Sequence, residues 1–208
     1  MLCFILNSRQ LQDEMINHIN KRTAAITTFI LLISFLKPLR IGTTIFFPIA
    51  SLFTSEKAYA NTVSWYITQG ILARNKGNYK AAIDFYNKAQ QINPNIDLIY
   101  LNRGFAKVKI EDFQGALKDY NKAIEINPQF AEAYMNRGTL KGGFFEDYSG
   151  SINDLNKALS INPKLANAYE GRGIAQLLIG ENEKACDDFK KALTFNNKTL
   201  DLFQKYCK

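Results

Sequence analysis

The sequence is poor in the side chains that build metal and nucleophilic centres. It contains three cysteines, Cys3, Cys186 and Cys207, and one histidine, His18, among 208 residues. A structural zinc site needs four nitrogen or sulfur ligands at set spacings, which these residues do not provide. The sequence also has no glycine-rich phosphate loop, no Ser-His-Asp constellation and no acid pair in a cleft. We therefore expect no catalytic activity, no cofactor and no small-molecule substrate.

The sequence has no extreme of charge or hydrophobicity. Lysine and arginine total 26 against 19 acidic residues, a formal net charge of +7, and 47% of the residues are hydrophobic. These values exclude wholesale disorder and a polytopic membrane protein. The length predicts one or two domains. Because the positive charge is spread along the chain and forms no concentrated basic patch, nucleic acid is not an expected partner.

Two apolar runs near the start of the chain indicate contact with a membrane. The run Thr23–Leu36 follows a basic pair, which is the order of charged and apolar residues in export signals. A second run, Ile41–Phe53, leads to Ala-Tyr-Ala at 58–60, which has the small-x-small form of a signal peptidase site. In this interpretation residues 1–60 are a cleaved signal peptide and the mature protein begins near Asn61.

Other interpretations of this segment stay open. Residues 23–53 could remain in the membrane as an anchor, either one tilted span or a shallow helical pair, or could form a buried helix of a soluble protein. Met15 is an alternative start, because the sequence after it would supply a conventional basic region. Both membrane interpretations put residues 61–208 on the periplasmic or lumenal side of a bacterial inner or thylakoid-type membrane.

The rest of the chain repeats with a period of 34 or 35 residues. YNKAQQINP at 86–94 recurs as YNKAIEINP at 120–128, as LNKALSINP at 155–163 and, less closely, as FKKALTFNN at 189–197. Each unit predicts two amphipathic helices. The second helix ends at Ile-Asn-Pro, where asparagine can take the left-handed conformation and proline cannot continue the helix.

Small residues recur in both halves of the unit, where two helix axes would approach closely. They are Gly70, Gly104, Gly138 and Gly173 in the first helix, and Ala82, Ala116, Ser151 and Ala185 in the second. A single helix pair cannot bury both of its apolar faces, so the pairs must stack. We expect an all-α, right-handed solenoid of four helix pairs. The predicted repeats are residues 63–96, 97–130, 131–165 and 166–199, with a capping helix at 200–207.

This pattern resembles the tetratricopeptide repeat (TPR), which has the same period, small positions, aromatic pairs and terminal proline. The resemblance covers residues 63–199, and the NRG triplets are similar to those of TPR proteins from photosynthetic bacteria. It implies an adaptor or scaffold that binds a protein or peptide on the concave face of the first helices, with the assembly of a larger complex as its expected role. An RNA-associated helical repeat protein and the non-catalytic subunit of an enzyme complex are alternatives.

The family's groove positions imply which residues would contact a partner. They map to Ile67, Ile71, Leu98, Leu101, Asn102, Phe105, Val108, Met135, Asn136, Thr139, Glu170, Ile174 and Leu177. The apolar members would form an exposed stripe, and the two asparagines would hold a peptide backbone through amide hydrogen bonds. Alternatively, some of them only pack neighbouring helices. The lysine and asparagine clamp for a terminal carboxylate is absent, because isoleucines occupy two of its positions.

Three repeats share an arginine in the first helix and an aspartate in the second. These are Arg103, Arg137 and Arg172, and Asp119, Asp154 and Asp188. The first repeat lacks both and has Gln69 and Phe85 instead. This joint presence and absence predicts that each arginine pairs with the aspartate of its own repeat, setting register more than net stability. A row of arginines that binds an anionic ligand is the alternative.

The third repeat carries one extra residue, within Lys-Gly-Gly-Phe-Phe at 141–145. We expect the two glycines to end the first helix early. The two phenylalanines would then be free to contact a partner or to pack in the core.

The last two cysteines lie on segments that should pack together. Cys186 is early in the last second helix, and Cys207 is at the end of the capping helix. The ending resembles that of other TPR domains with this cysteine pair, which implies a disulfide if the domain is exported to an oxidising compartment. Two buried free thiols are the alternative.

Overall fold

The computed structural model describes residues 50–195 and 199–207, with side chains described from Thr62 onward. The run Thr23–Leu36 and the alternative start at Met15 lie outside the described residues. The predictions of an export signal or an anchor therefore remain predictions.

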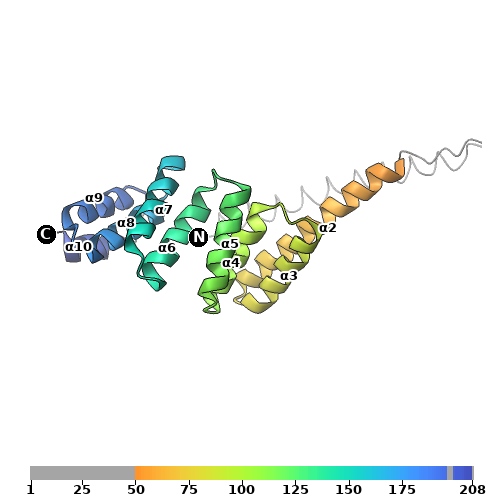
Figure 1. Ribbon diagram of the computed structural model, residues 1–208, viewed down its shortest axis with the longest axis horizontal. Helices are drawn as coiled ribbons and strands as arrows, with labels where there is room; N and C mark the ends of the chain where they lie inside the picture. Colours follow the sequence, from red (N-terminus) through yellow and green to blue (C-terminus); the bar gives the residue numbers. More distant parts are fainter. Residues whose placement is uncertain (1–49, 196–198, 208) are drawn as a thin grey trace, which may run out of the picture. The chain divides into compact units, whose positions relative to one another are not determined.

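The described residues form nine α-helices and no strand, and successive helices pack in pairs (Figure 1). The pairs are α2 (Ala50–Asn75) with α3 (Tyr79–Ile92), α4 (Asp97–Lys109) with α5 (Phe113–Ile126), α6 (Ala131–Phe144) with α7 (Tyr148–Ile161), and α8 (Ala166–Leu178) with α9 (Asn182–Leu193). Each second helix also packs against the next first helix. The prediction of an all-α solenoid of four helix pairs is confirmed.

Small residues set the close approach within each pair. A Cβ atom on Gly104 would lie 2.7 Å from the ring of Tyr120, and one on Gly173 would lie 2.6 Å from the ring of Phe189. Both rings are buried, and the alanines at the small positions of the second helices have no exposed surface. The close approach of the helix axes at the small positions, predicted from the repeat, is therefore present, and glycine there makes room for a large side chain in the core.

Three of the second helices, α3, α5 and α7, begin and end with side-chain hydrogen bonds to the backbone. Asp112 Oδ1 accepts from the N–H of Gly115 at 2.9 Å, which caps the start of α5. At the other end of α5, the prediction that the asparagine takes the left-handed conformation is wrong. Asn127 has φ −131° and ψ 91°, because the proline after it disfavours helical and turned conformations. Its Oδ1 instead accepts from the N–H of Gln129 at 3.1 Å.

The two glycines of the third repeat do not end its first helix early. Helix α6 continues through Gly142 and Gly143 to Phe144 and has 14 residues, against 13 in α4 and α8. It absorbs the extra residue by growing, and Glu146 then turns the chain with φ 54°. Phe144 is exposed and stacks on Phe113 of α5 with ring centroids 3.9 Å apart. Phe145 is half-buried against the core.

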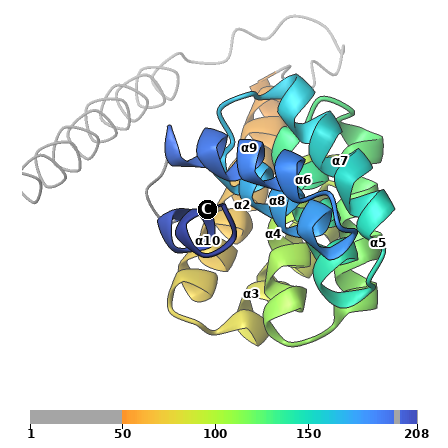
Figure 2. The ribbon, with the colours of Figure 1, turned by 90° about the vertical axis from the view of Figure 1, so that its left-hand side faces the viewer.

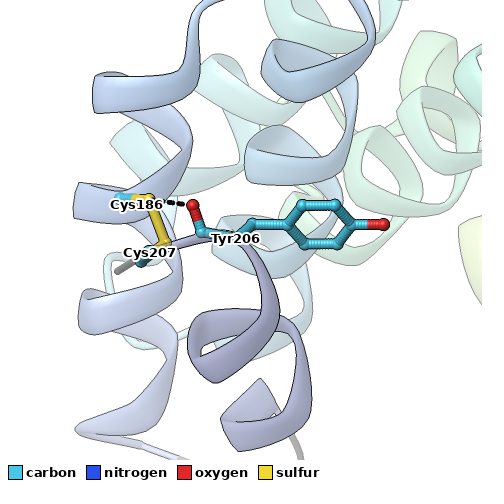
Figure 3. The surroundings of a disulfide bond; sticks show 3 residues. All are labelled: Cys186, Tyr206 and Cys207. Carbon is cyan, nitrogen blue, oxygen red and sulfur yellow. Dashed lines mark hydrogen bonds between the residues drawn. A yellow bond between two sulfur atoms is a disulfide. The ribbon is translucent and has the colours of Figure 1, made fainter.

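A short helix, α10 (Leu200–Tyr206), packs against α9 at the end of the solenoid (Figure 2). It contains no buried residue of its own. A disulfide joins Cys186 of α9 to Cys207 directly after α10, and Figure 3 shows the carbonyl oxygen of Tyr206 beside the Cys186 sulfur, 3.6 Å away. The covalent bond therefore holds the capping helix where burial contributes little.

Helix α2 is the longest of the described helices. It begins at Ala50 and is continuous across the predicted boundary between residues 60 and 61, so it extends beyond α3 (Figure 1). Within residues 50–195 and 199–207, no helix is long and apolar enough to cross a membrane.

Candidate functional site

Each of the three arginines forms a bidentate pair with the aspartate of its own repeat. Arg103 Nε and Nη2 donate to the two carboxylate oxygens of Asp119 at 2.9 and 2.7 Å. The distances are 2.8 and 2.6 Å for Arg137 with Asp154, and 2.7 and 2.6 Å for Arg172 with Asp188. The aspartate side chains are at most 8% exposed. Parallel hydrogen bonds of this kind neutralise each arginine, so they leave no open row for an anion.

The same arginines also reach back to the preceding repeat. Arg137 Nη1 donates to Asn121 Oδ1 at 2.7 Å, and the equivalent pairs are Arg103 with Asn87 at 2.7 Å and Arg172 with Asn156 at 2.5 Å. One guanidinium therefore ties three helices together. These acceptors were not predicted from the sequence, although the repeat contains a signal for them. Asparagine occupies this position in the first three repeats, and Lys190 replaces it in the fourth, after which no further repeat supplies an arginine.

The pairs are strengthened by further groups. Lys107 and Lys141 lie one turn after the arginine in their helices, and each approaches the same aspartate to 2.9 Å. In the fourth repeat the equivalent residue is Gln176, whose buried Oε1 has no hydrogen-bond partner within the described residues. Hydrogen bonding to Asp188 raises the pKa of Arg172, although burial opposes the shift. The network is structural in character, because its charges are satisfied internally.

The predicted groove residues lie on the first helices but differ in exposure. Leu98, Phe105 and Ile174 are exposed. The half-buried ones are Ile67, Ile71, Leu101, Val108, Met135, Asn136, Glu170 and Leu177, while Thr139 is exposed. Ile67, Ile71 and Leu101 pack against the core cluster around Tyr86, Val108 against the cluster around Tyr120, and Met135 against that around Leu155. Part of the predicted stripe therefore packs the repeats together.

Asn102 is not free to hold a peptide as the sequence suggested. It is buried, its Oδ1 accepts from Arg74 Nη1 at 2.6 Å, and its Nδ2 donates to the backbone carbonyl of Leu98 at 2.8 Å. Its amide instead joins the first two repeats, because Arg74 lies on α2. The amide oxygen of Asn102 is therefore already bound to Arg74.

A pocket of about 310 Å³ opens between α6, α7 and α8. It is lined by Thr139, Gly142, Gly143, Glu146, Tyr148, Ser151, Gly171, Ile174, Ala175 and Leu178. Ile174 is 39% exposed and Leu178 58% exposed. A side chain on Gly143 would meet nothing within 4 Å, and one on Gly171 would meet its nearest neighbour at 3.5 Å. Two glycines of the pocket, Gly143 and Gly171, therefore leave room that a side chain could occupy.

Ile174 was predicted from the sequence as a groove residue, but Gly171 was not. The signal is in the repeat itself, since YLNRG and YMNRG become YEGRG, with glycine at the asparagine position. Removing that side chain opens the surface between α6 and α8.

The described part of the chain contains no group of three histidine, cysteine, aspartate or glutamate side chains that could hold a metal ion. The candidate site is a surface with an apolar pocket and several exposed apolar side chains.

Comparisons with known proteins agree with this architecture. The family model described as tetratricopeptide repeat matches residues 63–96, and the one described as TPR repeat matches residues 106–141. No curated protein matches the sequence.

Solved structures with the same fold include MamA, with 26% identity, 74% of this chain and 86% of that chain covered, and a TM-score of 0.59. The thermophilic TPR protein TTC0263 of Thermus thermophilus has 20% identity, 65% and 75% coverage, and a TM-score of 0.60. The first TPR of Spaghetti (RPAP3), bound to the HSP90 peptide SRMEEVD, has 22% identity, 58% and 94% coverage, and a TM-score of 0.56. With these matches, residues 63–96 and 106–141 are tetratricopeptide repeats, and the described helices share the fold of the TPR solenoids.

Proposed function

We propose that the protein is an adaptor that binds a peptide segment of a partner protein on the concave face of its first helices. TPR repeats in general form protein-interaction modules, and the TPR fold is generally a non-catalytic scaffold. The observation that carries the proposal is the glycine-lined pocket beside the exposed Ile174 and Leu178. A pocket of this size can take one apolar side chain of a peptide. The similar fold that was solved with a bound HSP90 peptide supports a peptide as the partner.

The proposal includes delivery to a membrane, with the TPR domain on its periplasmic or lumenal side. Two features support it: the basic and apolar order before Ala60 in the sequence, and the disulfide between Cys186 and Cys207, which suits an oxidising compartment. Amino-terminal sequencing of the protein from its source cells tests this part. A start at Asn61 is expected if the leader is cleaved, and an intact amino terminus in the membrane fraction if it is a retained anchor. An intact amino terminus in the soluble fraction would contradict delivery to a membrane.

Filling the pocket tests the binding site directly. Gly171→Leu should fold normally, because a Cβ there meets only ordinary contacts and leucine favours a helix more than glycine does. Ser160→Leu on α7 is the matched control, since Ser160 is exposed and outside the pocket. Peptides would be selected from a displayed random library with the full-length chain, and their affinities measured for both variants.

We expect Gly171→Leu to weaken peptide binding at least tenfold, as for the loss of a buried apolar contact of about 1.4 kcal/mol. Ser160→Leu should leave it unchanged. Equal binding by both variants would mean that the pocket takes no part, and a library that yields no binder would contradict the function itself.

A further inference from the structure

Arg74 differs from the other arginines of the described chain because no carboxylate pairs with it. Its Nη1 donates to Asn102 at 2.6 Å, and its Nε and Nη2 donate to Asn75 Oδ1 at 3.3 and 3.2 Å. All of these acceptors are neutral amides. Arg103, Arg137 and Arg172 each hold an aspartate instead. The charge of Arg74 is therefore fixed in position but not neutralised.

The side chain of Arg74 is held in place by its neighbours. Asn102 is buried, and its Nδ2 is bound to the carbonyl of Leu98, so its Oδ1 must face Arg74. The guanidinium lies over the ring of Phe105, 5.6 Å from the ring centroid. A guanidinium has five N–H donors, and three hydrogen bonds leave donors for a further acceptor.

A second cation lies close to the same ring. Lys109 Nζ is 5.5 Å from the centroid of Phe105, and no acidic side chain of the described residues forms an ion pair with it. Leu98, Asn102, Phe105 and Lys109 follow one another at i, i+4, i+7 and i+11, so they share one face of α4. Leu98 is 47% exposed and Phe105 37% exposed.

We propose that this basic-aromatic patch, made of Arg74, Leu98, Phe105 and Lys109, binds an acidic side chain of the partner peptide that lies next to a bulky apolar residue. The carboxylate pairs with Arg74 and Lys109, and the apolar residue covers Phe105 and Leu98. The charge of the patch and its apolar surface select this combination. The proposal rests on the peptide-binding function and adds the kind of sequence that is bound.

Nucleic acid fits the patch less well. A phosphate backbone is bound by a track of cations with aromatic platforms along it. Along this solenoid the arginines of the next three repeats are all bound to aspartates, so the positive site is local and does not continue. One local positive site is enough to bind a single carboxylate, but it does not provide the row of cations that a phosphate backbone needs.

The test uses the full-length chain and peptides recovered from a displayed random library, each made also with its acidic residues changed to the corresponding amides. Arg74→Gln removes the charge and keeps a polar side chain. Lys109→Gln does the same at an exposed position. Lys80→Gln, at an exposed lysine of α3, is the control for the loss of one positive charge.

We expect the acidic peptides to bind the unmodified protein about tenfold more tightly than their amide forms, as for one charged hydrogen-bonded pair. Arg74→Gln should abolish that preference, Lys109→Gln should reduce it, and Lys80→Gln should retain it. A circular dichroism melt of each variant separates loss of binding from loss of folding, and Lys109→Gln keeps the test valid if Arg74→Gln unfolds.

Three results would overturn the inference: equal binding of acidic and amide peptides, equal losses in Arg74→Gln and Lys80→Gln, or tighter binding of a single-stranded RNA oligonucleotide that depends on Arg74. Peptides that bind without any acidic preference, yet lose affinity in Gly171→Leu, would reject this inference and leave the proposed function standing. A library without any binder would reject both.

Discussion

Removing Asp154 alone should destabilise the protein more than removing Asp154 and Arg137 together. The carboxylate accepts two hydrogen bonds from Arg137 and pairs with Lys141 at 2.9 Å, and its side chain is only 8% exposed. In Asp154→Ala, two cations that are 18% and 24% exposed are left facing each other. Breaking a buried pair costs about 3 to 5 kcal/mol, and the partial exposure places this loss near 3 kcal/mol.

The double variant leaves one cation, Lys141, which can turn towards water. Its remaining losses are the hydrogen bond from Arg137 to Asn121 at 2.7 Å and the packing of the guanidinium on Tyr134. These contribute about 1 to 2 kcal/mol together. The double variant should therefore be more stable than Asp154→Ala by about 1 to 2 kcal/mol, or a few degrees in melting temperature.

Thermal melts of the full-length chain, of Asp154→Ala, of Arg137→Ala and of the double variant measure this difference. Hydrogen exchange shows whether the difference is confined to α6 and α7. Because repeat arrays unfold unit by unit, the exchange rates of the third repeat are the sharper measurement. If the two single losses simply add in the double variant, the two residues do not interact, and the reasoning on the whole arginine network fails.

Gln176→Lys should place a second cation beside Asp188, as Lys107 and Lys141 do beside the aspartates of the second and third repeats. The free energy of unfolding measured in urea should rise by about 1 kcal/mol. No change would mean that the lysine does not reach Asp188. Tyr86→Phe should not lower stability at neutral pH, because the buried hydroxyl has no partner within the described residues. Burial raises the pKa of Tyr86 to about 12, above its ordinary value of 10. The Tyr86 hydroxyl therefore stays protonated to a higher pH in the folded state than in the unfolded state, so the free energy of unfolding falls as pH rises from about 10 to about 12. In Tyr86→Phe this contribution to the loss of stability should be absent. Cys186→Ser should lower the free energy of unfolding by about 3 kcal/mol, because the lost disulfide to Cys207 joins residues 21 positions apart. Amide hydrogen exchange in α10 should become faster. Melts that match those of the unmodified protein would contradict a stabilising disulfide.

The solenoid could be predicted from the sequence because the same pattern of packing residues recurs in each of the four repeats. Gly104 and Tyr120 illustrate it, since the absence of one side chain makes room for the other. Asn127 shows where such reasoning fails. Asparagine alone suggested a left-handed conformation at the helix end, but the steric effect of the following proline dominates. The conformation therefore has to be predicted from the Asn-Pro pair and not from asparagine alone.

The surface was harder to predict than the core. Asn102 was assigned to a peptide from its position alone, but the side chain of Arg74 on the neighbouring repeat reaches it first. That contact joins residues 28 positions apart and follows no repeat rule. The pocket at Gly171 depends on the absence of a side chain. Comparison of the repeats highlights the residues that they share, so it does not identify a position where one repeat has only glycine.

The first repeat explains why the arginine network stops where it does. Each arginine of the network bonds an aspartate of its own repeat and an asparagine of the previous second helix, so it is a link between repeats. Among the described helices, none precedes α2 in that position. Instead of the ion pair, Phe85 packs near Trp65 and Tyr66, with ring centroids 6.1 and 6.5 Å away, and Lys88 lies over two of these rings.

Within the described residues, the joint absence of arginine and aspartate therefore goes with the first place in the array. An arginine in place of Gln69 would have an aspartate to bind only if Phe85 were changed too, and the described residues offer it no asparagine from a preceding helix. The same reasoning separates Arg74 from the network: it lies on the first described helix of the array, bonds only amides and faces the exposed ring of Phe105. Because no carboxylate of the described residues pairs with Arg74, its charge stays available for the acidic residue proposed to bind this patch.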